Sequence, residues 1–540
     1  MQTKKIFMGI ATIAASAAIG IYGLWALYPL LITSGSHDAI PGDLGDARLL
    51  NIIMEHSFQY FFSDRSMDFW SPFWNFFPSR NALAMSDVMA TASLLYIPWR
   101  LLDFDYHSSL QLWHLSTSLA NYVSFIFFLR CVGVRLAPAS VGAFLFAFSL
   151  TRGGFLNHPQ LLAQFWTPLA LGFLIKWLRE NELRGQIKFA VVTVIMISCQ
   201  FWSAFYFGWF LAFGMMTLAG ILIFRFRGAL LRATLQRRAS ILVAGVTFLI
   251  LTGPLAMRHM MAAKDIGMRS TSDVLNGLPI LSDYLMPQTD TTFYQALFQW
   301  AKPAHENYSE FGMFLGTIPI LLLAMLLISE MRRNRASKLQ WQDNFPAYAA
   351  SLAAVLFLCI FLMITKWNHS DTLWRALVHV IPAAKAIRSM GRIVLFLLVP
   401  SGLIVAVYLD RLSQMKSRWA KIAAIVIGLA VIAEQHSDNR YAFSKSESMA
   451  EIQGVVKKIP SQCPVFYVNT RYDNFWRTAI NAMWASITTG KATLNGYSGG
   501  TPPGYQAMKL DQPGHATIND ANQWLKGFGN PPLAAECFLQ

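Results

Sequence analysis

The first long apolar segment of this chain is followed directly by the stretch Pro41-Gly-Asp-Leu-Gly-Asp-Ala-Arg48. Its two glycines leave the backbone free to turn, and the carboxylates of Asp43 and Asp46 stand three residues apart. Arg48 lies at the start of an expected amphipathic helix over residues 47–62. The same residue types are common in ordinary turns and helix caps. A carboxylate pair where a hydrophobic helix leaves the membrane also suits general-base or metal chemistry on a lipid-borne substrate.

The composition of the whole chain is that of a membrane protein. Of its 540 residues, 54% are hydrophobic and only 14% are charged, and the mean hydropathy is +0.39. Long apolar runs recur, and several can span a bilayer. We predict eleven crossings, at residues 6–32, 111–129, 136–150, 161–178, 189–224 (two crossings), 241–257, 311–328, 345–364, 393–409 and 422–432.

The placement of lysine and arginine orients these crossings. With the amino terminus in the cytoplasm, the inner segments hold 21 basic and five acidic residues, which accounts for the formal net charge of +15. The basic balance is therefore a sign of topology and gives no reason to expect nucleic acid as a partner. The amino-terminal segment is long and lacks a convincing cleavage site, so we interpret it as a retained anchor. We expect a multi-pass protein of the bacterial inner (plasma) membrane.

The first outer loop, residues 33–110, is acidic and rich in aromatic side chains. The aromatic run at 69–78 is typical of the headgroup level of a bilayer, and such rings also stack on sugars. The apolar stretch 82–102 would break the alternation of loops if it crossed the membrane. We therefore predict that it forms helices lying in the outer interface. Its one carboxylate, Asp87, should then fold back toward the two acidic residues that begin the loop.

Two other outer loops each carry one candidate polar group. His158 lies in a short outer turn, 151–160, at the mouth of a membrane helix. It serves either as a helix cap or as a group that touches substrate. Glu310 ends the second long outer loop, 258–310, where the chain enters the membrane. It is placed either for function or as an interfacial end-marker.

The third outer loop, residues 366–392, is unexpectedly basic, with five lysines and arginines against one aspartate. Arg388 and Arg392 are four residues apart, so on a helix they would share one face. A cationic face at an outer membrane interface suits an anion, and a lipid phosphate is the obvious one. Binding of bulk anionic headgroups is the alternative explanation.

The remainder of the chain, residues 434–540, is predicted to form a small extracytoplasmic α/β domain. Residues 465–468 have the pattern of a strand, and residues 476–488 that of a helix. Cys463 and Cys537 are the only cysteines in this outer part of the chain, where conditions are oxidising. We predict a disulfide between them.

The layout of residues 1–433 resembles the GT-C superfamily of membrane glycosyltransferases. The likeness lies in one helix, a long acidic first outer loop with interfacial helices, six further crossings and a second long outer loop. Members of this superfamily use polyprenyl-phosphate-linked sugars and keep a catalytic Asp or Glu early in the first outer loop, which here implies Asp43 and Asp46. The spacing Asp-Leu-Gly-Asp departs from the adjacent or singly spaced pair common there. The need for a divalent metal is therefore left open.

Together these features predict a glycosyltransferase that moves a sugar from a polyprenyl-phosphate donor to an extracytoplasmic acceptor. Asp46 or Asp43 would take the proton of the acceptor hydroxyl. Arg388 and Arg392 would hold the departing phosphate. The further candidates for binding sugar or acceptor are Arg48, Asp87, His158 and Glu310.

Two other functional classes are compatible with parts of the sequence. A non-catalytic lipid-binding or polysaccharide-assembly protein would use the basic loop 366–392 as a headgroup clamp, and its acidic pair would only form a turn. An ion-coupled transporter ranks third, because the membrane segments hold almost no ionisable residue at mid-depth.

Overall fold

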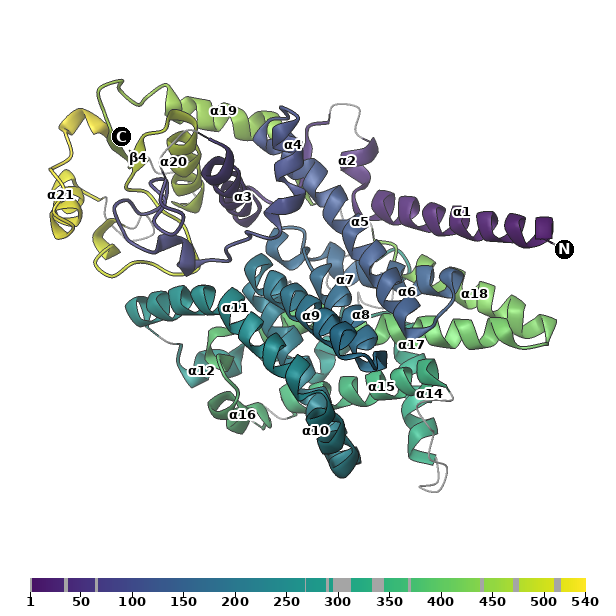
Figure 1. Cartoon of the computed structure of the whole chain (residues 1–540). Helices are drawn as coiled ribbons and strands as arrows, with labels where there is room; N and C mark the ends of the chain where they lie inside the picture. The colour runs from purple at the N-terminus through teal and green to yellow at the C-terminus, as the bar shows by residue number, and fades with distance from the viewer. Residues whose placement is uncertain are drawn as a thin grey trace.

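A computed structural model describes residues 2–33, 37–63, 67–267, 269–287, 291–294, 312–332, 344–367, 371–437, 441–469, 475–508 and 516–540. Within these ranges, nine helices are long and apolar enough to cross a membrane. Two further helices at predicted crossings, α14 (Thr317–Arg332) and α18 (Arg418–Glu434), are shorter. Each predicted crossing overlaps a helix, and the predicted class of polytopic α-helical membrane protein is confirmed (Figure 1). The nine long helices are α1 (Gln2–Leu27), α5 (Tyr106–Val132), α6 with α7 (Leu136–Gly153), η3 with α8 (Pro159–Arg179), α9 (Leu183–Ser203), α10 (Phe205–Gln236), α11 (Arg238–Ile266), α15 (Phe345–Ile364) and η7 with α17 (Met390–Gln414).

The centre of the helical bundle is formed where α17 (Val394–Gln414) packs against α6 (Leu136–Phe148). Gly142 of α6 faces Gly402 of α17 across this contact. A methyl group on Gly142 would stand 2.4 Å from the Gly402 carbonyl oxygen, and one on Gly402 would stand 2.7 Å from the Gly142 carbonyl oxygen. Small residues allow membrane helices to approach closely, and the dispersion gained there replaces the hydrophobic effect that lipid does not supply. This pair of glycines therefore lets the backbones of α6 and α17 approach each other closely.

The stretch 82–102 forms three short helices, η1 (Ala82–Met85), η2 (Ser93–Leu95) and α4 (Ile97–Leu101), and no membrane-spanning helix. Glu55 in α3 (Asp46–Phe62) accepts hydrogen bonds from the hydroxyl of Tyr96 (2.7 Å) and from the Nε of Arg100 (2.8 Å). The short helices are thus fixed against the helix that begins at the acidic stretch.

The part of the chain beyond α18 adds strands and helices beside the first outer loop. Strand β1 (Ala39–Pro41) pairs antiparallel with β2 (Ala442–Ser444), with Ile40 opposite Phe443. A second sheet has the strand order β4-β3-β5 and is parallel throughout. Helix α20 packs on α19 and on α3, and these helices gather at one end of the molecule (Figure 1). The strands and helices of this carboxy-terminal region are β3 (Val465–Val468), β4 (Ala492–Thr493), β5 (Phe538–Leu539), α19 (Lys445–Val456), α20 (Phe475–Thr489) and α21 (Ile518–Gly527).

The aromatic run of the first outer loop packs largely into protein. Trp74 and Phe76 are buried. The backbone N–H of Phe76 donates to the Asn495 carbonyl at 3.1 Å, and the indole N–H of Trp524 donates to the Phe77 carbonyl at 2.8 Å. These rings therefore form a common core with the carboxy-terminal region, and the bilayer-headgroup setting typical of such runs does not apply to their buried members.

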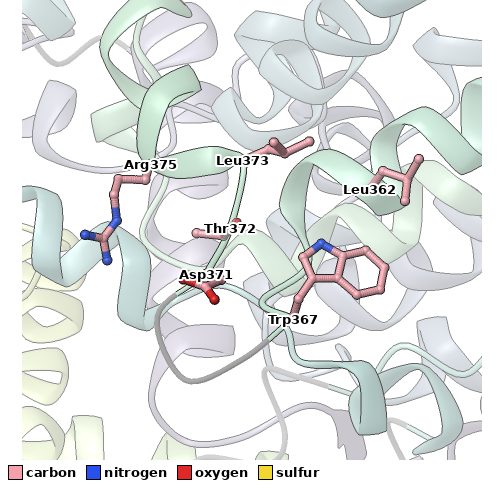
Figure 2. Close-up of a pocket in the computed structure, with 6 residues that line it drawn as sticks. All are labelled: Leu362, Trp367, Asp371, Thr372, Leu373 and Arg375. Carbon is pink, nitrogen blue, oxygen red and sulfur yellow. The ribbon is translucent and has the colours of Figure 1, made fainter.

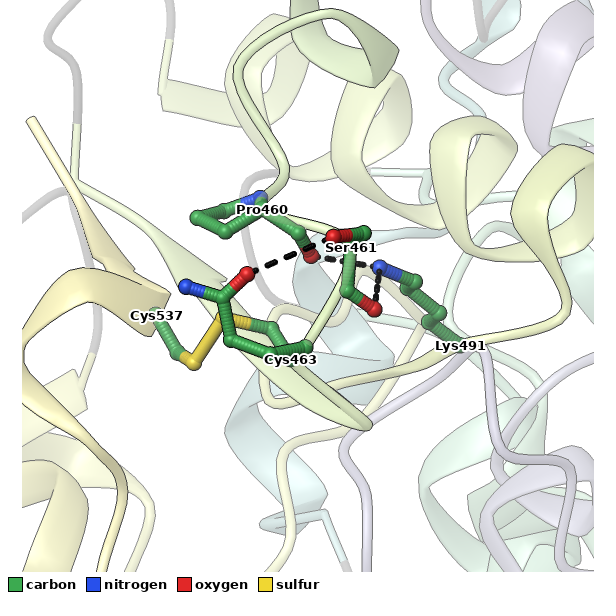
Figure 3. The surroundings of a disulfide bond; sticks show 6 residues. Pro460, Ser461, Cys463, Lys491 and Cys537 are labelled. Atoms are coloured by element: carbon green, nitrogen blue, oxygen red, sulfur yellow. Dashed lines mark hydrogen bonds between the residues drawn. A yellow bond between two sulfur atoms is a disulfide. The ribbon is translucent and has the colours of Figure 1, made fainter.

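The disulfide lies between the start of this carboxy-terminal sheet and its last strand (Figure 3). It joins Cys463 to Cys537, the two cysteines that the sequence predicted to pair, with 5.7 Å between their Cα atoms. The ammonium group of Lys491 donates to the carbonyl oxygens of Pro460 (2.5 Å) and Ser461 (3.0 Å) in the neighbouring turn. The turn before β3 is therefore fixed both covalently and by hydrogen bonds.

Candidate active site

The two carboxylates of the acidic stretch have different surroundings. Asp43 Oδ1 accepts the backbone N–H groups of Gly45 and Ala47, both at 3.1 Å. These hydrogen bonds close the turn before α3, and burial raises the pKa of the Asp43 carboxyl. One oxygen of Asp43 is thus occupied by the local backbone, as in an ordinary Asx turn.

Asp46, the first residue of α3, is held by side chains from two distant parts of the chain. Its Oδ2 lies 3.0 Å from His158 Nδ1, and its Oδ1 accepts a hydrogen bond from the Tyr497 hydroxyl at 3.2 Å. Its side chain keeps 30% of its surface exposed. Burial raises the pKa of Asp46, but the combined lowering effect of His158, Tyr497 and Arg392 is larger. The pKa therefore lies below its ordinary value. Asp46 is therefore an ionised carboxylate that a solute can reach.

The outer turn that carries His158 reaches Asp46 because of Gly42. This glycine has a φ of +113°, which L residues rarely adopt, and its N–H donates to the Tyr441 carbonyl at 3.1 Å. A methyl group on Gly42 would stand 3.0 Å from the Leu156 carbonyl oxygen. The turn can thus lie directly against the acidic stretch, which brings His158 next to Asp46.

Asp87 lies in the same electrostatic neighbourhood and is half-buried. It accepts the backbone N–H of Phe205 at 2.7 Å, at the start of α10. Burial raises the pKa of Asp87, while Arg392 and His158 both act to lower it. Asp87 therefore caps the start of α10.

Arg392 approaches the acidic group from the third outer loop. It lies in η7 (Met390–Ile393), and its guanidinium carbon is 5.0 Å from the centre of the Tyr206 ring. The Tyr206 hydroxyl accepts the backbone N–H of Arg388 at 3.2 Å. Arg388 is exposed and acts to lower the pKa of Tyr497, although burial raises that pKa overall. The two arginines and the acids at the start of the chain thus meet in one region.

The prediction that Arg388 and Arg392 share one face of a helix is wrong. Arg388 precedes Ser389, which has extended backbone, and only then does the short 3₁₀ helix η7 begin. The reason is a tight packing constraint, since a methyl group on Gly277 would stand 1.8 Å from the Arg388 carbonyl oxygen and Met390 N–H donates to the Gly277 carbonyl at 2.9 Å. The backbone at Arg388 and Ser389 therefore lies directly against Gly277, and it does not continue the helix that contains Arg392.

Arg48 lies apart from this cluster. Its side chain is fully buried, and it donates to Asn481 Oδ1 at 2.6 Å with Glu451 at 3.7 Å. Burial lowers the pKa of Arg48 to about 10. Arg48 thus joins α3 to α19 and α20 and does not line the space around Asp46. Glu310 lies outside the described residues.

Among the described residues, Tyr497 contacts Asp46 although the sequence did not suggest it as a candidate. It lies in the glycine-rich turn at 495–500, and 451 positions separate it from Asp46. The composition Asn-Gly-Tyr-Ser-Gly-Gly is typical of a turn, but nothing in its spacing indicates which carboxylate it meets.

The described residues contain no group of three or more His, Cys, Asp and Glu side chains that could hold a metal ion. The spacing of the acidic pair left open whether a divalent metal is needed, and the described residues offer no ligand set for one.

A separate hollow lies at the start of the third outer loop (Figure 2). Its volume is about 580 Å³, and it shares no residue with the cluster around Asp46. Figure 2 shows an indole ring and a leucine side chain on one side and a guanidinium group on the other. The hollow is lined by Leu362, Trp367, Asp371, Thr372, Leu373 and Arg375.

Fold and site together define a multi-pass helical membrane protein with a carboxylate, histidine and arginine cluster among its predicted outer loops. No protein-family model matches the chain, and no curated protein matches it. The structure is similar to the crystal structure of ArnT from Cupriavidus metallidurans in the apo state, with 10% identity, a TM-score of 0.38, and coverage of 89% of this chain and 85% of that chain. It is also similar to the structure of that protein bound to undecaprenyl phosphate, with 10% identity, a TM-score of 0.35, and coverage of 90% of each chain. Both likenesses are distant, and neither carries a statement about the activity of this chain.

Proposed function

We propose that this protein is a membrane glycosyltransferase that moves a sugar from a polyprenyl-phosphate donor to an extracytoplasmic acceptor. The observation that carries the proposal is the environment of Asp46. An ionised and partly exposed carboxylate stands 3.0 Å from a histidine, and Arg392 is near enough to lower its pKa. This arrangement supports a base for an acceptor hydroxyl and a cation for a phosphate leaving group at one site.

The chemical step follows from these positions. Asp46 takes the proton of the acceptor hydroxyl as that oxygen forms a bond to the anomeric carbon of the sugar. The bond between the anomeric carbon and the phosphate oxygen breaks, and its electron pair leaves with the polyprenyl phosphate. Arg392, with Arg388 beside it, stabilises the negative charge that develops on that phosphate. His158 holds Asp46 in place and stabilises its charged form.

The test compares two conservative variants in one assay. Purified protein is incubated with a radiolabelled polyprenyl-phosphate sugar and extracted envelope lipids as acceptors. Asp46→Asn should abolish transfer, because an amide cannot take the proton. Asp43→Asn is the matched control: its amide oxygen can still accept the N–H groups of Gly45 and Ala47, so most activity should remain. Full activity in Asp46→Asn would overturn the assignment, and loss confined to Asp43→Asn would transfer the role of base to that residue.

One observation favours the non-catalytic alternative, a lipid-binding or polysaccharide-assembly protein. Arg388 is exposed, and the hollow beside the same basic loop combines Trp367 with Arg375, a pairing that suits a lipid headgroup. The same assay separates the two functions. Such a protein would bind the labelled lipid without releasing polyprenyl phosphate, and its binding would be unchanged in Asp46→Asn.

A further inference from the structure

We propose that Tyr497 is a positioning residue for Asp46, so that the carboxy-terminal region completes the active site. This inference rests on the proposed function and deepens it. It assigns a role to a part of the chain that lies more than 400 residues beyond the acidic stretch.

The first argument is the way the two carboxylate oxygens are shared. Tyr497 donates to Oδ1 at 3.2 Å, while His158 lies 3.0 Å from Oδ2. Each oxygen is thus oriented by a group from a different segment, and the plane of the carboxylate is set by both. A general base must present its lone pair within hydrogen-bond reach of the proton that it takes, so a fixed orientation matters for the reaction.

The second argument is the rigidity of the turn that carries Tyr497. The side chain of Asn495 accepts the N–H of Val468 at 2.8 Å and donates to the Val468 carbonyl at 2.9 Å, which attaches the turn to β3. The N–H of Tyr497 donates to Asn75 Oδ1 at 3.2 Å, which attaches it to the first outer loop. A methyl group on Gly496 would stand 2.2 Å from the Phe76 ring, so the backbone lies directly on that ring. The backbone that carries Tyr497 is therefore held from both sides.

The third argument is the charge around the pair. The groups that act on Asp46 are His158 from the outer turn, Tyr497 from the carboxy-terminal region, Asp43 from its own stretch and Arg392 from the third loop. Burial raises the pKa of Tyr497, so its hydroxyl is protonated at neutral pH and acts as a donor. Removing that donor should make Asp46 harder to ionise.

The test uses the full-length protein in detergent and does not depend on catalysis. A carbodiimide modifies protonated carboxyl groups, and mass spectrometry of the Asp46 peptide follows the extent of labelling against pH. In Tyr497→Phe the midpoint for Asp46 should move to higher pH. Tyr505→Phe is the matched control, because it removes a buried hydroxyl that donates to the Leu494 carbonyl in the same region. Its labelling curve should match that of the unaltered protein.

A transfer assay with the labelled donor then links this change to turnover. Tyr497→Phe should lower kcat/KM by about tenfold, the value of one hydrogen bond to a charged group, and should shift the acidic limb of the pH profile upward. Coincident labelling curves for Tyr497→Phe and the unaltered protein would overturn the role of Tyr497. Absence of transfer in the unaltered protein, with the labelling shift still present, would instead overturn the proposed function and leave the positioning contact supported.

Discussion

At the scale of single residues, the site depends on how His158 changes the carboxylate beside it. The pKa of Asp46 lies below its ordinary value because His158, Tyr497 and Arg392 outweigh the effect of burial. A carboxyl group whose pKa is lowered on folding stabilises the fold above its unfolded pKa of about 4, and that stabilisation is lost as the pH falls through the lowered value. The same shift keeps the base ionised in mildly acidic surroundings.

His158→Ala should therefore shift the pH dependence of transfer as well as lower its rate. Without His158, the pKa of Asp46 rises, and the acidic limb of the kcat/KM profile moves to higher pH. We expect a loss of roughly tenfold at the acidic end of the profile, with partial recovery as the pH is raised. The measurement is the transfer rate between pH 5 and 8. A uniform loss at every pH would contradict an action through Asp46 and indicate a merely structural role.

Residue types alone could identify most of this cluster but could not assign the roles. Asp46, Asp87, His158 and Arg392 were all predicted as candidates, since each lies in a predicted outer loop close to an apolar segment. Asp43 and Arg48 carry the same signals, yet the first closes a turn and the second is buried between helices. Only the packing of distant segments distinguishes residues that surround Asp46 from residues that serve the fold alone. For the same reason the sequence did not indicate Tyr497.

At the scale of elements, glycines set the distances between the segments that meet at the site. Gly42 admits the turn with His158, and Gly277 admits the backbone at Arg388. Neither contact is visible in the sequence, because a glycine in a loop has many common explanations. The membrane helices were predictable for the opposite reason: a long apolar run has few alternatives to spanning a bilayer.

Gly277→Ala tests this steric argument. The φ of Gly277 is −80°, which alanine adopts readily, so the only cost is the methyl group that would stand 1.8 Å from the Arg388 carbonyl oxygen. The backbone at Arg388 must then shift, and transfer should fall by about tenfold or more, since small displacements of positioning groups are costly. Gly245→Ala in α11 is the control, because nothing lies within 4 Å of its new methyl group. Equal activity in both variants would show that Arg388 needs no fixed position.

At the scale of the whole molecule, the first outer loop and the carboxy-terminal region share one core. Phe76 is buried between them, β1 pairs with β2, and Arg48 joins α3 to α20. The strand at 465–468 and the helix after it were predicted from local patterns. The attachment of this strand and helix to a loop about 400 residues earlier could not be predicted, because no local pattern specifies a partner at that distance.

Removing the disulfide should destabilise this shared part of the molecule. Cys463 and Cys537 are 74 positions apart, and closing a loop of that length in the unfolded chain is worth about 4 kcal/mol in the chain-entropy treatment. The double variant Cys463→Ser with Cys537→Ser should therefore unfold at a lower temperature. The unfolding transition is measured by tryptophan fluorescence as the temperature is raised. Cys199→Ser, which removes a free cysteine from α9, should leave the transition in place. A transition in the double variant that coincides with that of the unaltered protein would contradict the prediction.

The pairing of β1 with β2 also has a consequence for biosynthesis. Ala39 leaves the ribosome early, whereas its partner Ser444 follows 405 residues later. At a translation rate of about 5 to 20 residues per second, the wait lasts roughly 20 to 80 seconds. Throughout that interval the early loop has neither its partner strand nor the later residues that cover Phe76. Assembly of the proposed active site must therefore be a late event, completed only after the last helices have entered the bilayer.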